Sequence, residues 1–80
     1  MRLTYDPRHN VAYLRLQEKR QQVETIRITD AVNVDLAPDG SVYGIELLNA
    51  SELLRGEEAG KLIVENQMTG ALVEVELKLN

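Results

Sequence analysis

The stretch AVNVDLAPDGSVYGIELLNA, from Ala31 to Ala50, decides the fold because it has the pattern of one β-hairpin. Apolar and polar residues alternate on both sides of a Pro-Asp-Gly corner, which is the period of two expected of half-buried strands. Pro38 favours the first central position of a type I turn, Asp39 can hydrogen-bond its own backbone, and Gly40 tolerates a positive φ. We therefore predict two antiparallel strands joined at this corner.

The register of the hairpin follows from its apolar side chains, because a slip of one residue would send the whole set to the opposite face. The predicted inward residues are Val32, Val34 and Leu36 on the first strand and Tyr43, Ile45 and Leu47 on the second. These sets coincide if Leu36 faces Tyr43. We predict a loop over residues 38–41 for this register, and a shorter turn with a bulge at Gly40 is the alternative.

The same register collects polar residues on the other face, with Asn33 opposite Glu46 and Asp35 opposite Gly44. Asn33, Asp35 and Glu46 therefore form the candidate interaction face. Two carboxylates on one face can act as a catalytic pair, bind a divalent cation, or receive Arg or Lys from a partner. The alternative is that they are the solvent-facing half of the hairpin.

Length and composition indicate a small domain with a thin core. We expect residues 1–80 to be a single domain, and its 44% of hydrophobic residues include neither Phe nor Trp, so pairing as a homodimer would supplement the core. The absence of Cys excludes disulfides and thiolate metal sites. No apolar run approaches the ~20 residues of a membrane span, and no signal-peptide pattern opens the chain, so we expect a cytoplasmic protein.

Charge is unevenly distributed around the net value of −4. Residues 1–40 carry six Lys or Arg against six Asp or Glu, whereas residues 41–80 carry three against seven. This balance disfavours nucleic acid as a partner and favours a basic protein. Nucleic-acid binding would require the arginines of the first half to share one face, namely Arg2, Arg8, Arg15 and Arg27.

Alternation of period two continues outside the hairpin. It predicts further strands over residues 1–5, 11–17, 24–29, 62–66 and 73–79, with a solvated loop over 18–22, for which a helix over 16–24 is the alternative, and a turn at 68–70. Asn49 or Ser51 can cap a short helical turn that runs to Arg55, although a longer helix over 51–66 is the alternative. The predicted fold is mainly β, a small α+β protein: an antiparallel sheet of five to six strands with one short helix after the central hairpin.

Two stretches share the motifs of one family. YDPRHNVAYLRL at residues 5–16 and VNVDLAPDGSVYGIELLNAS at residues 32–51 resemble the short prokaryotic proteins grouped as domain of unknown function 2283. The candidate structural motif consists of the matching residues Tyr5, Asp6, Pro7, Asp39, Gly40 and Gly44. The family-like region covers residues 1–55 and leaves a C-terminal β extension over 56–80. The resemblance implies a small β-rich fold and genes beside toxin-like partners, so that some members are proposed antitoxins.

These observations favour a non-enzymatic protein–protein interaction module, such as an antitoxin-like protein that neutralises a basic partner encoded nearby. The chain is poor in catalytic residue types, since His9 is its one histidine and has no companion at a ligand or nucleophile spacing. We predict neither a metal site nor a cofactor. The alternative is a small-molecule enzyme or ligand binder using Asp6, Asp35 and Glu46, which requires these carboxylates to converge in a concave pocket.

Overall fold

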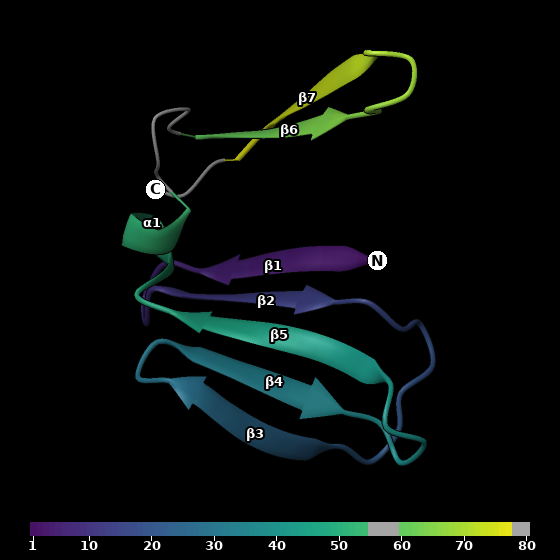
Figure 1. The fold of residues 1–80 in the computed structure, drawn as a ribbon. Coiled ribbons are helices and arrows are strands. Elements are labelled where there is room, and N and C mark those ends of the chain that lie inside the picture. Colours follow the sequence, from purple (N-terminus) through teal and green to yellow (C-terminus); the bar gives the residue numbers. More distant parts are fainter. Residues whose placement is uncertain (55–59, 78–80) are drawn as a thin grey trace. The chain divides into compact units, whose positions relative to one another are not determined.

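The structure, a computed structural model, describes residues 1–54 and 60–77. Its elements are β1 (Arg2–Asp6), β2 (Val11–Arg15), β3 (Glu24–Thr29), β4 (Val32–Leu36), β5 (Val42–Leu48), α1 (Ala50–Leu53), β6 (Lys61–Glu65) and β7 (Leu72–Glu76). The strands form a five-stranded sheet and a separate two-stranded sheet, both antiparallel (Figure 1). The predicted fold class, a mainly β protein with one short helix after the central hairpin, is confirmed.

The contacts of the chain divide it into two compact units, Met1–Ala50 and Ser51–Asn80. The five-stranded sheet belongs to the first unit and the β6–β7 hairpin to the second. The single domain over residues 1–80 stays a prediction, and the predicted boundary between residues 55 and 56 lies outside the described residues. No helix among the described residues is long and apolar enough to cross a bilayer.

The five-stranded sheet has the strand order β1-β2-β5-β4-β3. The β1–β2 hairpin and the β3–β4–β5 meander meet where β5 pairs with β2, and there Leu14 lies opposite Ile45. Residues 18–22 connect the hairpin to the meander and contain neither helix nor strand, so the alternative helix over 16–24 is wrong. At the β3 edge the register shifts between Arg27 and Thr29, which places a bulge in that strand.

Alternation gives the sheet one apolar and one polar face. On the apolar face lie Leu3, Tyr5, Ala12, Leu14, Ile26, Val32, Val34, Leu36, Ile45 and Leu47, as the strand registers imply. Among the described residues only Ala12, Ala37, Tyr43 and Ala50 are buried hydrophobics. The sheet therefore has no core of large, fully buried aliphatic side chains.

The central hairpin forms with the predicted register over four pairs. Asp35 lies opposite Gly44 and Asn33 opposite Glu46, and the flanking pairs are Val34 with Ile45 and Val32 with Leu47. The pair next to the turn was predicted wrongly. Leu36 lies opposite Val42, not opposite Tyr43.

The turn explains this difference. The amide of Gly40 donates to the carbonyl of Ala37 at 2.9 Å, and Gly40 has a φ of 89°, so the chain uses the shorter turn with a bulge at Gly40. A second register shift then leaves Tyr43 without a partner on β4 and restores the predicted pairing from Gly44 onward. As a consequence Tyr43, which was predicted to point inward with Ile45, lines a hollow together with residues of the polar face.

The second unit contains the β6–β7 hairpin. For its first strand the sequence allowed a helix over 51–66 as the alternative. Residues Lys61–Glu65 form β6, as preferred for 62–66, and the turn at 68–70 is confirmed by a 2.7 Å hydrogen bond from the amide of Gly70 to the carbonyl of Asn66. The last strand, β7, ends at Glu76, and the predicted continuation to Leu79 lies outside the described residues. Arg55, the predicted end of the short helix, also lies outside the described residues.

Candidate functional site on the polar face of the sheet

The polar face of the five-stranded sheet brings together side chains from all of its strands. They are Arg2 and Thr4 on β1, Tyr13 and Arg15 on β2, Gly44 and Glu46 on β5, Asn33 and Asp35 on β4, and Thr25 and Arg27 on β3. The predicted interaction face is thus on one side of the sheet. It is not uniformly acidic, because three arginines share it with the carboxylates of Asp6, Asp35 and Glu46.

Asp35 sits at the centre of a hydrogen-bond network. The hydroxyl of Tyr13 donates to Asp35 Oδ2 at 2.6 Å, and the hydroxyl of Thr25 donates to Asp35 Oδ1 at 2.6 Å. Burial, followed by the hydrogen bond to Asp35, raises the pKa of Tyr13 well above its usual value near 10. Tyr13 therefore stays protonated at neutral pH and holds one oxygen of the carboxylate.

Gly44 makes this hydrogen bond possible. Tyr13 is on β2 and Asp35 on β4, so the tyrosine must cross β5, which lies between them. A Cβ atom at Gly44 would lie 2.3 Å from the Tyr13 hydroxyl oxygen and 2.5 Å from its Cζ. The missing side chain gives the ring its path across the strand.

Asn33 and Glu46 form a second pair on this face. They are cross-strand partners, and Asn33 Nδ2 donates to Glu46 Oε1 at 3.0 Å. Asp35 and Glu46 thus lie on the same face, but each accepts hydrogen bonds from the protein itself. The two carboxylates form part of the cross-strand bonding of the sheet.

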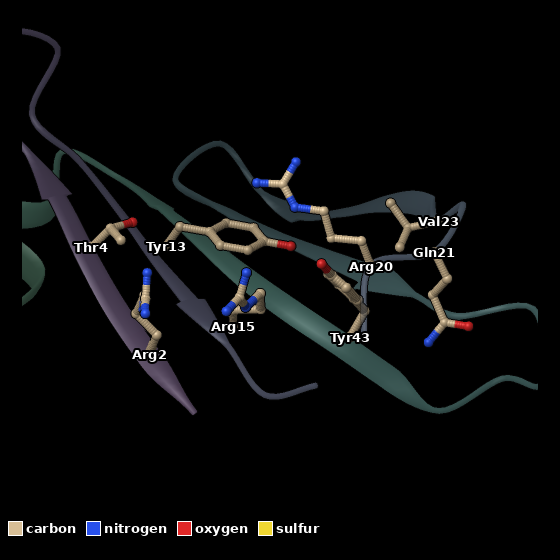
Figure 2. Close-up of a pocket in the computed structure, with 8 residues that line it drawn as sticks. All are labelled: Arg2, Thr4, Tyr13, Arg15, Arg20, Gln21, Val23 and Tyr43. Carbon is tan, nitrogen blue, oxygen red and sulfur yellow. The ribbon is translucent and has the colours of Figure 1, made fainter. Parts of the chain in front are cut away.

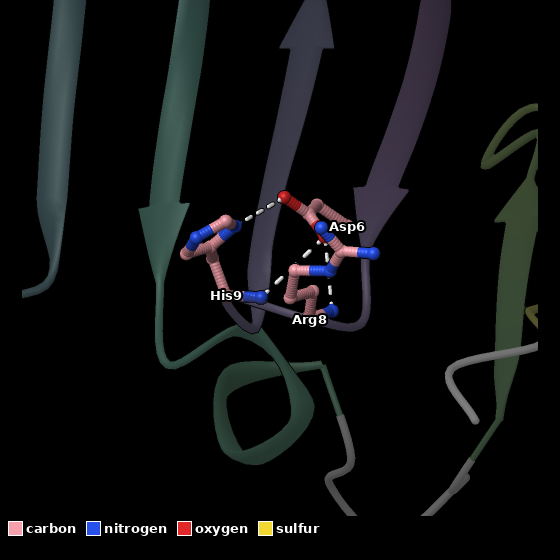
Figure 3. A network of polar contacts seen from close by, with 3 residues as sticks. All are labelled: Asp6, Arg8 and His9. Atoms are coloured by element: carbon pink, nitrogen blue, oxygen red, sulfur yellow. Dashed lines mark hydrogen bonds and ion pairs between the residues drawn. The ribbon is translucent and has the colours of Figure 1, made fainter.

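Asp6 lies apart from this network, at the end of β1 and next to the turn into β2 (Figure 3). Its Oδ1 accepts from the amides of Arg8 and His9 at 2.9 and 3.4 Å, and its Oδ2 lies 2.7 Å from His9 Nδ1. The hydrogen bond from the His9 ring is the main reason why the pKa of Asp6 is lowered. This is the geometry of the Asx turn that the Asp-Pro pair suggests.

Asp6 therefore does not lie beside Asp35 and Glu46, as the alternative of a small-molecule enzyme or ligand binder requires. Asp6 pairs with Val11 at one end of the β1–β2 hairpin, whereas Asp35 is three strands away, on β4. A pair of residues separated by that many strands is more than ~10 Å apart. Within residues 1–54 and 60–77, no group of three or more His, Cys, Asp or Glu side chains is placed to hold a metal ion.

The rest of the candidate structural motif shapes turns. Asp39 Oδ1 accepts from the Ser41 amide at 3.0 Å and from its hydroxyl at 2.6 Å, and these bonds lower the pKa of Asp39. The Tyr5 hydroxyl donates to Asn10 Oδ1 at 3.0 Å beside the turn that follows Pro7. Asn10 has a φ of 55°, a left-handed conformation that asparagine tolerates well.

A hollow of about 440 Å³ opens on the polar face (Figure 2). It is lined by Arg2, Thr4, Tyr13, Arg15, Arg20, Gln21, Val23 and Tyr43. Sequence reasoning missed this site because Arg20 comes from the loop that was expected to be solvated and Tyr43 was assigned to the apolar face. The sequence did contain one sign of a cationic site. A hairpin of the first two predicted strands can place Arg2 opposite Arg15, as the structure does.

The fold and this face define a small protein with one open antiparallel sheet whose two faces differ in chemistry. Comparison with protein families matches residues 2–51 to the family described as protein of unknown function (DUF2283), and the chain belongs to that family. The match spans the five strands of the sheet, including Tyr13, Asp35 and Gly44. Neither the curated proteins nor the solved structures contain a match to the chain.

Proposed function

We propose that the chain is a non-enzymatic protein–protein interaction module. The observation that supports this function is the apolar face of the five-stranded sheet, whose side chains are partly exposed to solvent. On its two edge strands, Leu3 is 36% exposed and Ile26 is 40% exposed. Apolar side chains arranged over one face of a sheet are stabilised by a second layer, which can belong to another molecule.

A second copy of the chain is the partner that we propose for this face. The face carries apolar side chains on all five strands, so two copies related by a twofold axis would present matching surfaces to each other. Dimerisation would bury the exposed parts of Leu3 and Ile26. Each Å² of apolar surface removed from water stabilises the dimer by about 25 cal/mol. The homodimer would supply the core that the single chain has only in part.

Measurement of the mass in solution tests the homodimer. We expect a mass near twice the 9.0 kDa of the chain at micromolar concentration by light scattering after gel filtration. Leu3→Lys should shift the protein toward the monomer, whereas Thr4→Lys, on the opposite face of the same strand, should not. A wild-type protein that stays monomeric would contradict the proposal.

We propose the acidic face of the β6–β7 hairpin as the surface for a basic partner. Glu65, Glu74 and Glu76 share one face of this hairpin with Lys61, the single cation on it among the described residues. The Lys61 Nζ lies 3.7 Å from Glu74 Oε2. The polar face of the larger sheet is a poorer candidate because three arginines offset its carboxylates, Asp6, Asp35 and Glu46. An antitoxin-like role toward a protein encoded nearby would use this acidic surface.

Capture of the product of the adjacent gene tests the antitoxin-like role. Binding should occur at low salt and weaken at high salt, because exposed charges are screened. Glu74→Lys together with Glu76→Lys should abolish binding, while the matched change Lys61→Glu should preserve or strengthen it. Binding that is unchanged in both of these variants would contradict the use of this surface.

A further inference from the structure

The hollow on the polar face is rich in cationic side chains. Arg2, Arg15 and Arg20 line it, and no carboxylate is among its lining residues. Figure 2 shows the three guanidinium groups and the hydroxyls of Tyr13 and Tyr43 around the same space. In the part of the chain that the structure describes, neither the Arg2 nor the Arg20 side chain forms a salt bridge or hydrogen bond.

The backbone register brings two of these cations together. Arg2 and Arg15 are direct cross-strand partners. Like charges directly opposite each other on neighbouring strands are destabilising. The Arg15 side chain is only 22% exposed, so water screens it less than a free surface arginine. An anion in the hollow would convert this repulsion into attraction.

Among residues 1–54 and 60–77, Glu18 is the one carboxylate in an ion pair with either arginine. Its Oε2 lies 3.9 Å from an Arg15 terminal nitrogen, and its Oε1 lies 3.0 Å from the amino group of Met1. The Glu18 side chain is 80% exposed and lies outside the lining of the hollow. It therefore competes weakly for Arg15 and leaves the interior of the hollow open to another anion.

The two tyrosines contribute differently. The Tyr13 hydroxyl is already used in its 2.6 Å hydrogen bond to Asp35, so this residue supplies an aromatic wall. The bulge in β5 turns Tyr43 toward the hollow, where its hydroxyl makes no hydrogen bond to the described residues. Tyr43 is thus a free donor beside three guanidinium groups.

We propose that this hollow binds the phosphate group of a small phosphorylated molecule. Guanidinium groups recognise phosphate by paired, charge-assisted hydrogen bonds, and a tyrosine hydroxyl can add a further donor. Arg2, Arg15, Arg20 and Tyr43 would hold the phosphate oxygens, and the Tyr13 ring would contact the remainder of the ligand. This binding site goes beyond the proposed interaction function and uses the opposite face of the sheet.

Titration of the full chain with inorganic phosphate and with adenosine monophosphate tests the site. Amide NMR shifts in low-salt buffer should change around the hollow, with saturation at millimolar or lower concentration. Arg2→Gln combined with Arg20→Gln should weaken binding by about tenfold or more, since each lost charged hydrogen bond is costly. Arg27→Gln is the matched control, because Arg27 is on the same face but pairs with Asp30 outside the hollow.

A second variant distinguishes a specific phosphate site from non-specific attraction of anions to positive charge. Glu18→Gln removes the competitor for Arg15 and should tighten phosphate binding by about twofold to fivefold. Loss of binding that is equal in Arg27→Gln and the double variant would overturn the proposal. So would no saturable phosphate binding at millimolar concentration, or binding of a single-stranded oligonucleotide without binding of either small phosphate. None of these results depends on whether the protein dimerises.

Discussion

Gly44 shows how one residue type determines the chemistry of a whole face. Its missing side chain lets Tyr13 cross β5 and reach Asp35, and the same tyrosine forms a wall of the arginine-lined hollow. Sequence analysis predicted Asp35 opposite Gly44 correctly. It did not predict the hydrogen bond, because alternation places residues on faces but does not show which side chains lean across a neighbouring strand.

Gly44→Ala should destabilise the protein by about 1–3 kcal/mol, because the new methyl group displaces the Tyr13 ring and weakens its hydrogen bond. Urea unfolding followed by circular dichroism measures the change. In a Tyr13→Ala background the same substitution should cost much less, since the clash is then absent. Equal costs in both backgrounds would show that Tyr13 is not what constrains position 44.

Tyr13→Phe should lower the free energy of unfolding by about 1–2 kcal/mol at pH 8 through loss of the hydrogen bond to Asp35. The folded state raises the pKa of Tyr13, so this tyrosine contributes stability that is present below pH 10 and is lost as the pH rises above it. The difference between wild type and Tyr13→Phe should therefore shrink between pH 9 and pH 11. A difference that stays constant with pH would contradict the raised pKa.

At the scale of elements, the central hairpin was predictable in its strands but not in its irregularities. Alternation identified β4 and β5 and four of their cross-strand pairs. The error at Leu36 arose because two bulges, one at Gly40 and one at Tyr43, shift the register and then restore it. Tyrosine is amphipathic, so the pattern alone gave no reason to assign Tyr43 to the polar face.

Gly40→Ala should cost about 1 kcal/mol, because Gly40 has a φ of 89° and a side chain there is strained even though the space around it is open. Gly40→Asn should cost less, since asparagine tolerates the left-handed region better. Chemical unfolding of both variants gives the comparison. If alanine and asparagine are equally tolerated, backbone conformation does not limit this turn.

At the scale of the whole molecule, alternation predicted the strands of the first unit, and the single domain over residues 1–80 stays a prediction. The family match, residues 2–51, and the first compact unit, Met1–Ala50, end at almost the same place. Composition gave little sign of this division, because apolar and acidic residues continue through β6 and β7. The hollow also escaped sequence analysis, since its lining comes from residues as far apart as Arg2 and Tyr43.

The division predicts that residues 1–54 fold without the second unit. This fragment should retain the β-sheet signal in circular dichroism, unfold cooperatively and keep dispersed amide resonances for β2 and β5. The full chain under the same conditions is the reference. A fragment without dispersed resonances would show that the sheet needs residues 55–80 to fold.

The bulge in β3 has a consequence for the borders of the open sheet. An outermost strand can recruit a strand from another molecule, and an irregularity interrupts the ladder of free backbone groups that such recruitment needs. The interruption between Arg27 and Thr29 makes the β3 border a poor template, whereas β1 pairs regularly from Arg2 to Asp6. Head-to-tail growth of the five-stranded sheet into fibres would require both of its borders, so the defect in β3 disfavours that route.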